Sequence, residues 1–291
     1  MWPQSTVKQQ GPGFYRHKMG DLLITALYDG FINLPPALFH GLKADEMQTR
    51  VSREVQTPDG LPTDITAYLI DDGSDLVLID AGGDKWRGPA MGGLLENMKA
   101  AGYWPESVSA ILLTHLHFDH VCGLNDAECR PAFPNAAVYA SEDECRFWLT
   151  PQPQLTATKE NRTFFHIATR AVAPYRNKRA FFEFKDGDEI RPGIKALLTP
   201  GHSPGHTSFL VSSGRDRLLL WGDIVLSAAL QLPCPQVSND YDFDQAQAAA
   251  TRLSIFKKVI EENWLVGGGH LPFPGLGRLV EKEPGYGWAP L

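Results

Sequence analysis

The sequence has no long apolar run: its hydrophobic stretches are far shorter than the roughly 20 residues that a helix needs to cross a bilayer. Its first residues, Met1–Thr6, also lack the basic start and the apolar stretch of a secretion signal. We therefore expect a protein with no membrane partner and a cytoplasmic location. An exported form whose signal has been removed is the alternative.

Cysteine is scarce, and basic residues are outnumbered by acidic ones. The 4 cysteines show no Cys-x-x-Cys spacing, which indicates free thiols in a reducing compartment and not a disulfide framework. The 27 Lys and Arg against 34 Asp and Glu give a net charge of −7, and no basic block stands out. Nucleic acids and anionic membranes attract clustered Lys and Arg, so the composition argues against a nucleic-acid partner.

The chain has enough apolar residues for a core of ordinary size, since 43% of its 291 residues are hydrophobic and 21% are charged. Apolar, β-prone runs alternate with helical patterns, and polar residues gather where the runs end. This alternation predicts an α/β layered fold, and we expect one domain over 1–291. The predicted strands are Leu22–Tyr28, Ile65–Ile70, Leu76–Ile79, Val108–Leu113, Ile194–Leu198, Ser208–Ser212 and Arg217–Trp221, and the predicted helices are Met91–Ala101 and Phe243–Asn263, the latter capped by Asp242 or Asp244.

The segment 14–63 is predicted to hold an N-terminal strand, a turn at Asp29-Gly30 and then a long connection over Asn33–Thr63. This connection is rich in Pro and Gly but carries apolar side chains such as Leu34 and Phe39. Long ordered loops of this kind often act as lids or binding loops. We expect the segment either to overhang the functional site or to pack on the core or on a partner subunit.

The strongest chemical signal is the run from His115 to His120, which reads His-Leu-His-Phe-Asp-His. It holds four potential metal ligands and comes directly after the predicted strand Val108–Leu113. A turn at this point can direct His115 and His117 to one metal while Asp119 and His120 face a second one. Imidazole and carboxylate groups suit Zn²⁺, Mn²⁺, Co²⁺ or Fe²⁺.

Further ligands are expected from three other loops, each of which leaves a predicted strand or a glycine run. His202 lies in Pro200–His206, a Gly- and Pro-rich turn that also contains His206. Asp223 follows the strand that ends at Trp221, and His270 follows three glycines. Loops at the ends of regular elements are the usual place for active-site groups. Together with the His115–His120 run, these residues predict a two-metal site.

The order of these motifs, together with Asp80-Ala81-Gly82 at a strand end, resembles the metallo-β-lactamase superfamily over nearly the whole chain. The resemblance implies an αββα sandwich with a binuclear metal site, expected to hold Zn²⁺, at the edge between the two sheets. Asp80 would then orient a ligand histidine, and His206 would lie behind the ligands. The implied ligands are His115, His117 and His202 for one metal and Asp119, His120 and His270 for the other, with Asp223 bridging both.

A narrower resemblance is to methyl parathion hydrolases and their lactonase and arylesterase relatives. It rests on the Gly-His-Leu-Pro-Phe-Pro-Gly run within Leu265–Gly275, on Asp-Gly followed by Leu-Pro in Asp29–Phe39, and on the aromatic pairs Phe147-Trp148 and Phe164-Phe165. The resemblance implies a homodimer and a small hydrophobic or aromatic substrate: an ester, a lactone or a phosphotriester.

The chain departs from related families at informative positions. Acyl-homoserine lactonases usually carry Tyr three residues after the bridging Asp, where this chain has Leu226, which argues for a more apolar pocket. Class B β-lactamases lack the bridging carboxylate that Asp223 would supply, so β-lactam hydrolysis is not expected as the main activity. Cys122 stands where the family often has Gly, and we expect a buried structural thiol there in preference to a metal ligand.

The resemblance implies that a hydroxide bridging the two metals is the nucleophile, because metal binding lowers the pKa of water towards 7. Asp223, as the bridge, and Asp119, as a proton carrier to the leaving group, are the residues expected to act in catalysis. Aromatic and apolar side chains near the motifs are the candidates for the substrate pocket. These candidates are Phe118, Trp148, Phe164, Phe165, Phe181 and Leu226.

We therefore expect a lactonase or arylesterase with promiscuous phosphotriesterase activity. A dedicated organophosphate hydrolase is the alternative, because a few pocket side chains decide between the two. A persulfide dioxygenase would hold a single iron and consume oxygen, so metal stoichiometry separates it from a hydrolase.

Overall fold

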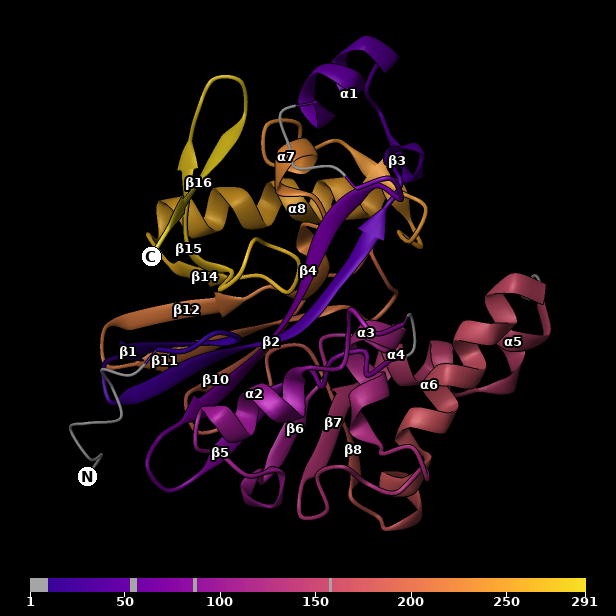
Figure 1. Ribbon diagram of the computed structural model, residues 1–291, viewed down its shortest axis with the longest axis vertical. Coiled ribbons are helices and arrows are strands. Elements are labelled where there is room, and N and C mark those ends of the chain that lie inside the picture. The colour runs from indigo at the N-terminus through magenta and orange to yellow at the C-terminus, as the bar shows by residue number, and fades with distance from the viewer. Residues whose placement is uncertain (1–9, 53–56, 86–87, 157–158) are drawn as a thin grey trace.

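The computed structural model describes residues 10–52, 57–85, 88–156 and 159–291. Within these ranges, two seven-stranded sheets face each other, and helices cover their outer faces, as Figure 1 shows. This is the αββα sandwich that the sequence predicts. The chain builds most of the first sheet before it enters the second one, so each half of the sequence supplies one sheet with its covering helices.

The first sheet has the strand order β1-β2-β4-β5-β6-β7-β8. Strands β1 to β5 pair antiparallel along this order, whereas β5, β6, β7 and β8 pair in parallel. The strands are β1 (Phe14–Met19), β2 (Leu22–Leu34), β4 (Leu61–Asp71), β5 (Leu76–Ile79), β6 (Ala110–Leu112), β7 (Ala137–Ser141) and β8 (Phe181–Phe184).

The second sheet has the order β16-β15-β14-β12-β11-β10-β9, in which β12 and β14 are parallel and the other neighbours are antiparallel. Its strands are β9 (Glu189–Arg191), β10 (Ile194–Leu198), β11 (Thr207–Ser213), β12 (Asp216–Leu220), β14 (Leu265–Gly267), β15 (Leu276–Glu281) and β16 (Tyr286–Pro290). A two-stranded ladder joins β3 (Phe39–His40) to β13 (Ser238–Asn239).

The helices lie outside the sheets and at the ends of strands. Helices α2 and α6 cover the first sheet, and α8 covers the second (Figure 1). Helix α8 is capped by Asp244, whose side chain accepts a hydrogen bond from Gln247 N–H at 2.9 Å. The helices are α1 (Ala44–Val51), α2 (Leu94–Ala100), α3 (Phe118–Val121), α4 (Glu142–Trp148), α5 (Pro151–Thr156), α6 (Lys159–Asn177), α7 (Ala228–Gln231) and α8 (Gln245–Glu261), with 3-10 turns at Pro36–Leu38, Pro105–Ser107, Cys122–Leu124 and Gly222–Ile224.

The alternation of side chains between the two faces of each strand explains how the two sheets and the covering helices form layers. In β5, Val77 and Ile79 point between the sheets, where they join Phe209 of β11 in one buried cluster. Leu78 points the other way and packs under the covering helices, for example against Met98 of α2. Successive side chains of a strand face opposite sides of its sheet, so a strand that is apolar at every position is buried on both faces.

The segment 14–63 is more regular than its sequence predicts. Strand β2 does not end in a turn at Asp29-Gly30 but continues to Leu34, because the register shifts between Tyr28 and Gly30 in a β-bulge. Gly30 has φ of 135°, and a Cβ there would lie 2.0 Å from the Ala90 carbonyl oxygen. The bulge turns the Asp29 carboxylate inward, where it accepts the N–H groups of Gly83 and Leu94.

The rest of this segment packs on the second half of the chain. Leu34 and Phe39 share a buried cluster with Leu226, Leu230 and Val237. In Figure 1, β2 and β4 extend beyond the first sheet towards α1 and α7, which lie side by side. The described parts of this segment therefore pack on the same chain, while a role over the functional site and a homodimer contact remain predictions.

All 4 cysteines are free thiols. In the part of the chain that is described, no helix has the length and apolar character to cross a bilayer.

Candidate metal centre

Side chains from four loops meet at one edge of the sandwich. The loop after β6 and the helix α3 together carry four of them, and the loops after β10, β12 and β14 carry one each. They form two groups, and within each group the ligand atoms lie within 4.8 Å of one another. The first group is His115, His117, His202 and Asp223, and the second is Asp119, His120 and His270.

In the first group, three imidazoles point their nitrogens at one another. His117 Nδ1 lies 3.0 Å from both His115 Nε2 and His202 Nε2. Asp223 Oδ2 lies 3.2 Å from His202 Nε2 and 3.6 Å from His115 Nε2. A proton can be shared by only two facing nitrogens at a time, whereas a cation can be bound by all three and by the carboxylate.

In the second group, Asp119 Oδ2 lies 3.4 Å from His270 Nε2 and 3.7 Å from His120 Nε2. Asp223 belongs to this group as well, since its Oδ2 lies 3.2 Å from His270 Nε2 and its Oδ1 lies 3.2 Å from His120 Nε2. The Asp223 carboxylate therefore lies between the two groups and contacts imidazoles of both.

These distances fit two metal ions. The ligand atoms of a tetrahedral zinc ion with bonds of about 2.0–2.1 Å lie about 3.4 Å apart, and the contacts to Asp223 and Asp119 range from 3.2 to 3.7 Å. His120 Nε2 and Asp223 Oδ1 are also buried without a hydrogen-bond partner among the described residues. A buried polar atom left in this way is costly unless an ion or water satisfies it.

The far side of three ligand rings is also held. His120 Nδ1 lies 2.8 Å from Asp80 Oδ2, and the same carboxylate accepts the N–H and O–H groups of Thr114. His202 Nδ1 lies 3.0 Å from Asp242 Oδ1, and His270 Nδ1 lies 2.8 Å from a main-chain carbonyl oxygen. An acceptor at Nδ1 fixes the tautomer and leaves Nε2 free to bind a metal.

His206 lies behind the ligands and belongs to neither group. Its Nδ1 lies 2.8 Å from Thr199 Oγ1, and its Nε2 accepts the N–H of Asp223 at 3.0 Å. Burial, with the nearby charge of His202, lowers the pKa of His206 to about 3, so the ring is neutral and can accept this hydrogen bond. This hydrogen bond fixes the main chain of Asp223, whose carboxylate lies between the two groups.

The electrostatics of the protein alone pair imidazolium with carboxylate. Burial opposes charge on His202 and His270, but hydrogen bonds and the charge of Asp223 outweigh it and raise the pKa of these rings to about 9 and about 10. Burial also opposes ionisation of Asp223, yet the imidazoles of His270 and His120 hold the pKa of its carboxyl well below the usual range. Protons therefore occupy positions that metal ions would take, and metal binding must displace them.

Glu144 joins the two loops that carry histidine ligands, and the sequence analysis missed it. Its Oε1 accepts the Leu116 N–H at 2.9 Å, and its Oε2 accepts the Ser203 O–H at 2.7 Å and the Gly205 N–H at 2.9 Å. Trp148 Nε1 donates to the same carboxylate at 2.6 Å. The side chain is buried at the start of α4 and gives no metal-binding pattern in sequence, so only the fold reveals its role.

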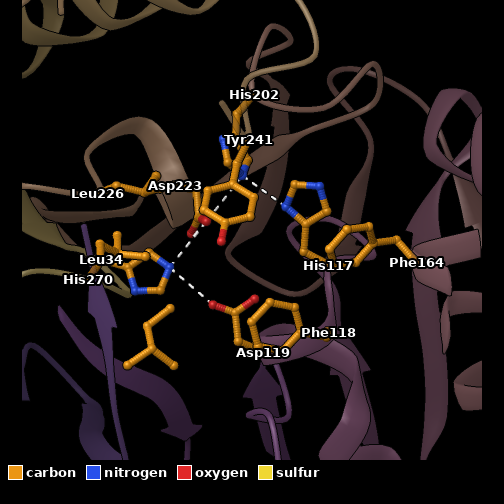
Figure 2. A pocket seen from close by; sticks show the side chains of 11 residues that line it. Leu34, His117, Phe118, Asp119, Phe164, His202, Asp223, Leu226, Tyr241 and His270 are labelled. Atoms are coloured by element: carbon orange, nitrogen blue, oxygen red, sulfur yellow. Dashed lines mark hydrogen bonds and ion pairs between the residues drawn. The ribbon is translucent and has the colours of Figure 1, made fainter. Parts of the chain in front are cut away.

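A pocket opens onto both groups (Figure 2). Five apolar side chains and one tyrosine share its wall with the ligands His117, Asp119, His202, Asp223 and His270. Phe118, Phe164 and Leu226 are pocket candidates from the sequence that lie in this wall. Tyr241 was not predicted, because nothing in its local sequence shows that it reaches the metal groups. Ile32 and Leu34 belong to the segment 14–63, for which an overhang of the functional site was one of the expectations.

Three other pocket candidates lie outside the wall. Phe165 and Trp148 are buried in the core beneath the covering helices, with ring centroids 4.8 Å apart, although Trp148 also contacts the edge of His117. Phe181 begins β8 and packs on the same core. Aromatic side chains more often fill a core than line a site, and these three fill the core.

Cys122 belongs to neither metal group, and burial, with the charge of Asp119, raises the pKa of its thiol to about 12.

The chain belongs to the metallo-β-lactamase superfamily, whose model matches residues 60–281. Among solved structures, the hydrolase AbOPH of the beta lactamase superfamily has a TM-score of 0.92 and 37% identity, over 97% of this chain and 99% of that chain. The dizinc quorum-quenching lactonase AidC, in complex with a product, has a TM-score of 0.87 and 26% identity, over 96% of this chain and 97% of that chain.

Curated relatives match over shorter stretches. An N-acyl homoserine lactonase from Bacillus cereus is 32% identical over 124 residues, which is 42% of this chain and 40% of that protein. The probable metallo-hydrolase M6_Spy0554 from Streptococcus pyogenes serotype M6 is 31% identical over 159 residues, which is 54% of this chain and 60% of that protein. The chain thus spans about half the length of these curated relatives.

Replacing Asp223 with Ala should leave the protein with fewer than two tightly bound metal ions per chain, because both groups lose their shared carboxylate. Inductively coupled plasma mass spectrometry after gel filtration measures the ratio. Asp240→Ala is the matched control, since this acidic residue is on the surface and contacts His40 outside the two groups. Two metals per chain and full activity in the Asp223 variant would contradict the assignment.

Metal binding at pH 7 should release protons, since the pKa values of His202 and His270 lie at about 9 and about 10 in the protein alone. Raising the pH towards 9 removes part of this competition, so the apparent affinity for Zn²⁺ should rise by about tenfold per pH unit for each displaced proton. Calorimetric titration in two buffers with different heats of ionisation counts the protons. Equal heats in both buffers would show that no proton is displaced.

Proposed function

We propose that this protein is a dinuclear metal-dependent hydrolase that acts on lactones and aryl esters, with neutral phosphotriesters as slower, promiscuous substrates. The observation that carries the proposal is the composition of the cavity beside the metal groups. Apart from the ligands and Tyr241, its wall consists of Ile32, Leu34, Phe118, Phe164 and Leu226.

This wall selects for a neutral, hydrophobic substrate. No Lys or Arg lines the cavity within the described residues, so a charged group held away from the metals would lose its hydration without a counter-charge from a side chain. A lactone, an aryl ester or a phosphotriester carries no charge and offers an apolar body to the Phe118 and Phe164 rings, which lie 6.4 Å apart between centroids. Phosphate monoesters and nucleic acids are disfavoured on the same ground.

The residues have separate roles in this proposal. Two bound divalent ions, Zn²⁺ or alternatively Mn²⁺, Co²⁺ or Fe²⁺, would act as Lewis acids and supply a water of lowered pKa. One ion would be held by His115, His117 and His202, and the other by Asp119, His120 and His270. The Asp223 carboxylate would contact both ions. The Asp119 carboxylate lines the cavity, so it is placed to pass a proton to the leaving alcohol.

The names of the relatives support a lactone in particular as the substrate. AidC is named as a lactonase with a product bound, and several curated relatives are named N-acyl homoserine lactonases. Leu226 is apolar where such enzymes usually have Tyr, so we propose aromatic and hydrophobic lactones ahead of acyl-homoserine lactones. The homodimer and the cytoplasmic location remain predictions from the sequence.

A hydrolysis comparison on one zinc-loaded preparation tests the proposal. We expect kcat/KM for dihydrocoumarin, an aromatic lactone, to exceed that for methyl paraoxon by at least about a hundredfold, which corresponds to about 2.7 kcal/mol of transition-state stabilisation. Chelation should abolish both activities, and adding the metal back should restore them.

A preference for the phosphotriester would instead establish an organophosphate hydrolase with the same metal groups. Turnover of neither substrate by protein with two metals per chain would overturn the proposal. Oxygen consumption by a preparation with a single iron would then point to dioxygenase chemistry.

A further inference from the structure

Tyr241 brings the only hydroxyl group into the wall of the metal cavity, among the residues described there. Figure 2 shows its ring among His117, His202 and His270, with the hydroxyl end turned towards the middle of the pocket. The other uncharged residues of the wall are aliphatic or phenylalanine side chains, which can neither donate nor accept a hydrogen bond.

The Tyr241 hydroxyl makes no hydrogen bond to any other described residue, whereas the main-chain N–H of Tyr241 is bonded to Asn239 Oδ1 at 2.9 Å. A phenolic O–H beside apolar side chains gains little from its surroundings and is available to a bound molecule. The fold does not use this oxygen, which leaves it available to a molecule that enters the cavity.

The turn that carries Tyr241 is fixed to a metal ligand. The carboxylate of Asp242, the next residue, lies 3.0 Å from His202 Nδ1 through Oδ1 and accepts the Asn239 N–H at 3.0 Å through Oδ2. Phe243 N–H donates to the His202 carbonyl oxygen at 3.0 Å, and Asn239 is fully buried. A donor that is held in place before the substrate binds needs no reorganisation during the reaction.

We infer that Tyr241 is a catalytic residue, which donates its phenolic hydrogen bond to the substrate oxygen that becomes negatively charged when water adds to the carbonyl or phosphoryl centre. The proton stays on the tyrosine oxygen throughout, so Tyr241 stabilises charge and transfers none. The inference rests on the proposed function, because it requires a substrate with such an oxygen in this cavity.

The test is Tyr241→Phe in the zinc-loaded protein, which removes one oxygen atom and no contact within the fold. Tyr15→Phe is the matched control, since Tyr15 is a half-buried tyrosine of β1 that packs on the core between the sheets, away from the cavity. Loss of one donor to a developing oxyanion costs about 10²-fold in kcat. We expect this loss in kcat and in kcat/KM alike, with KM, metal content and melting temperature unchanged.

A second readout does not depend on turnover. A phenyl methylphosphonate anion carries the tetrahedral geometry and the charge of the addition step, and calorimetry gives its affinity for the zinc-loaded protein. Tyr241→Phe should weaken its binding by about 10- to 100-fold, the usual effect of one hydrogen bond to a charged group, and Tyr15→Phe should leave it unchanged.

The two proposals fail in different ways. A wild-type protein that hydrolyses no lactone or aryl ester contradicts the proposed function, while the phosphonate comparison still tests Tyr241. Equal kcat and equal phosphonate affinity in wild type and Tyr241→Phe would overturn the inference. A loss of activity that accompanies an equal loss of bound zinc would overturn it as well, since it would reveal a structural role.

Discussion

The structure depends on one buried carboxylate, that of Asp223, on which four imidazoles converge. His115, His202 and His270 approach its Oδ2 at 3.6, 3.2 and 3.2 Å, and His120 approaches its Oδ1 at 3.2 Å. Polar atoms this close together in a protein interior need positive charge between them, which protons supply in the protein alone and metal ions would supply after displacing the protons. The αββα sandwich provides the place, since loops after strands of both sheets end at the same edge.

Hydrogen bonds behind the ligands turn this cluster into a rigid site. Asp80 and Asp242 each fix one ring, and His206 fixes the main chain of Asp223. Glu144 then joins the loop of the first histidines to the loop of His202. The turn of Asp242 also carries Tyr241, so the residue that orients a metal ligand is adjacent to the one that we propose to contact the substrate. Metal binding and substrate recognition are thereby built on the same short segment.

The sequence predicted the residues whose chemistry is local and missed those whose position depends on the fold. Four candidate ligands within His115–His120 form a pattern that few other structures explain, and buried strands such as Leu76–Ile79 are apolar enough to be located from sequence alone. The residues that line the pocket were harder to predict from the sequence. Trp148 and Phe165 belong to the core because the helices that carry them pack on the first sheet, whereas Leu34 reaches the cavity because a bulge at Asp29-Gly30 lets β2 continue past the expected turn. No local pattern distinguishes these two outcomes.

Anomalous X-ray diffraction at the zinc edge, on crystals of the zinc-loaded protein, tests the central claim most directly. The account predicts two zinc peaks per chain, one within bonding distance of His115, His117 and His202 and the other within bonding distance of Asp119, His120 and His270, with Asp223 in contact with both. A single peak, or two peaks that do not share the Asp223 carboxylate, would contradict it.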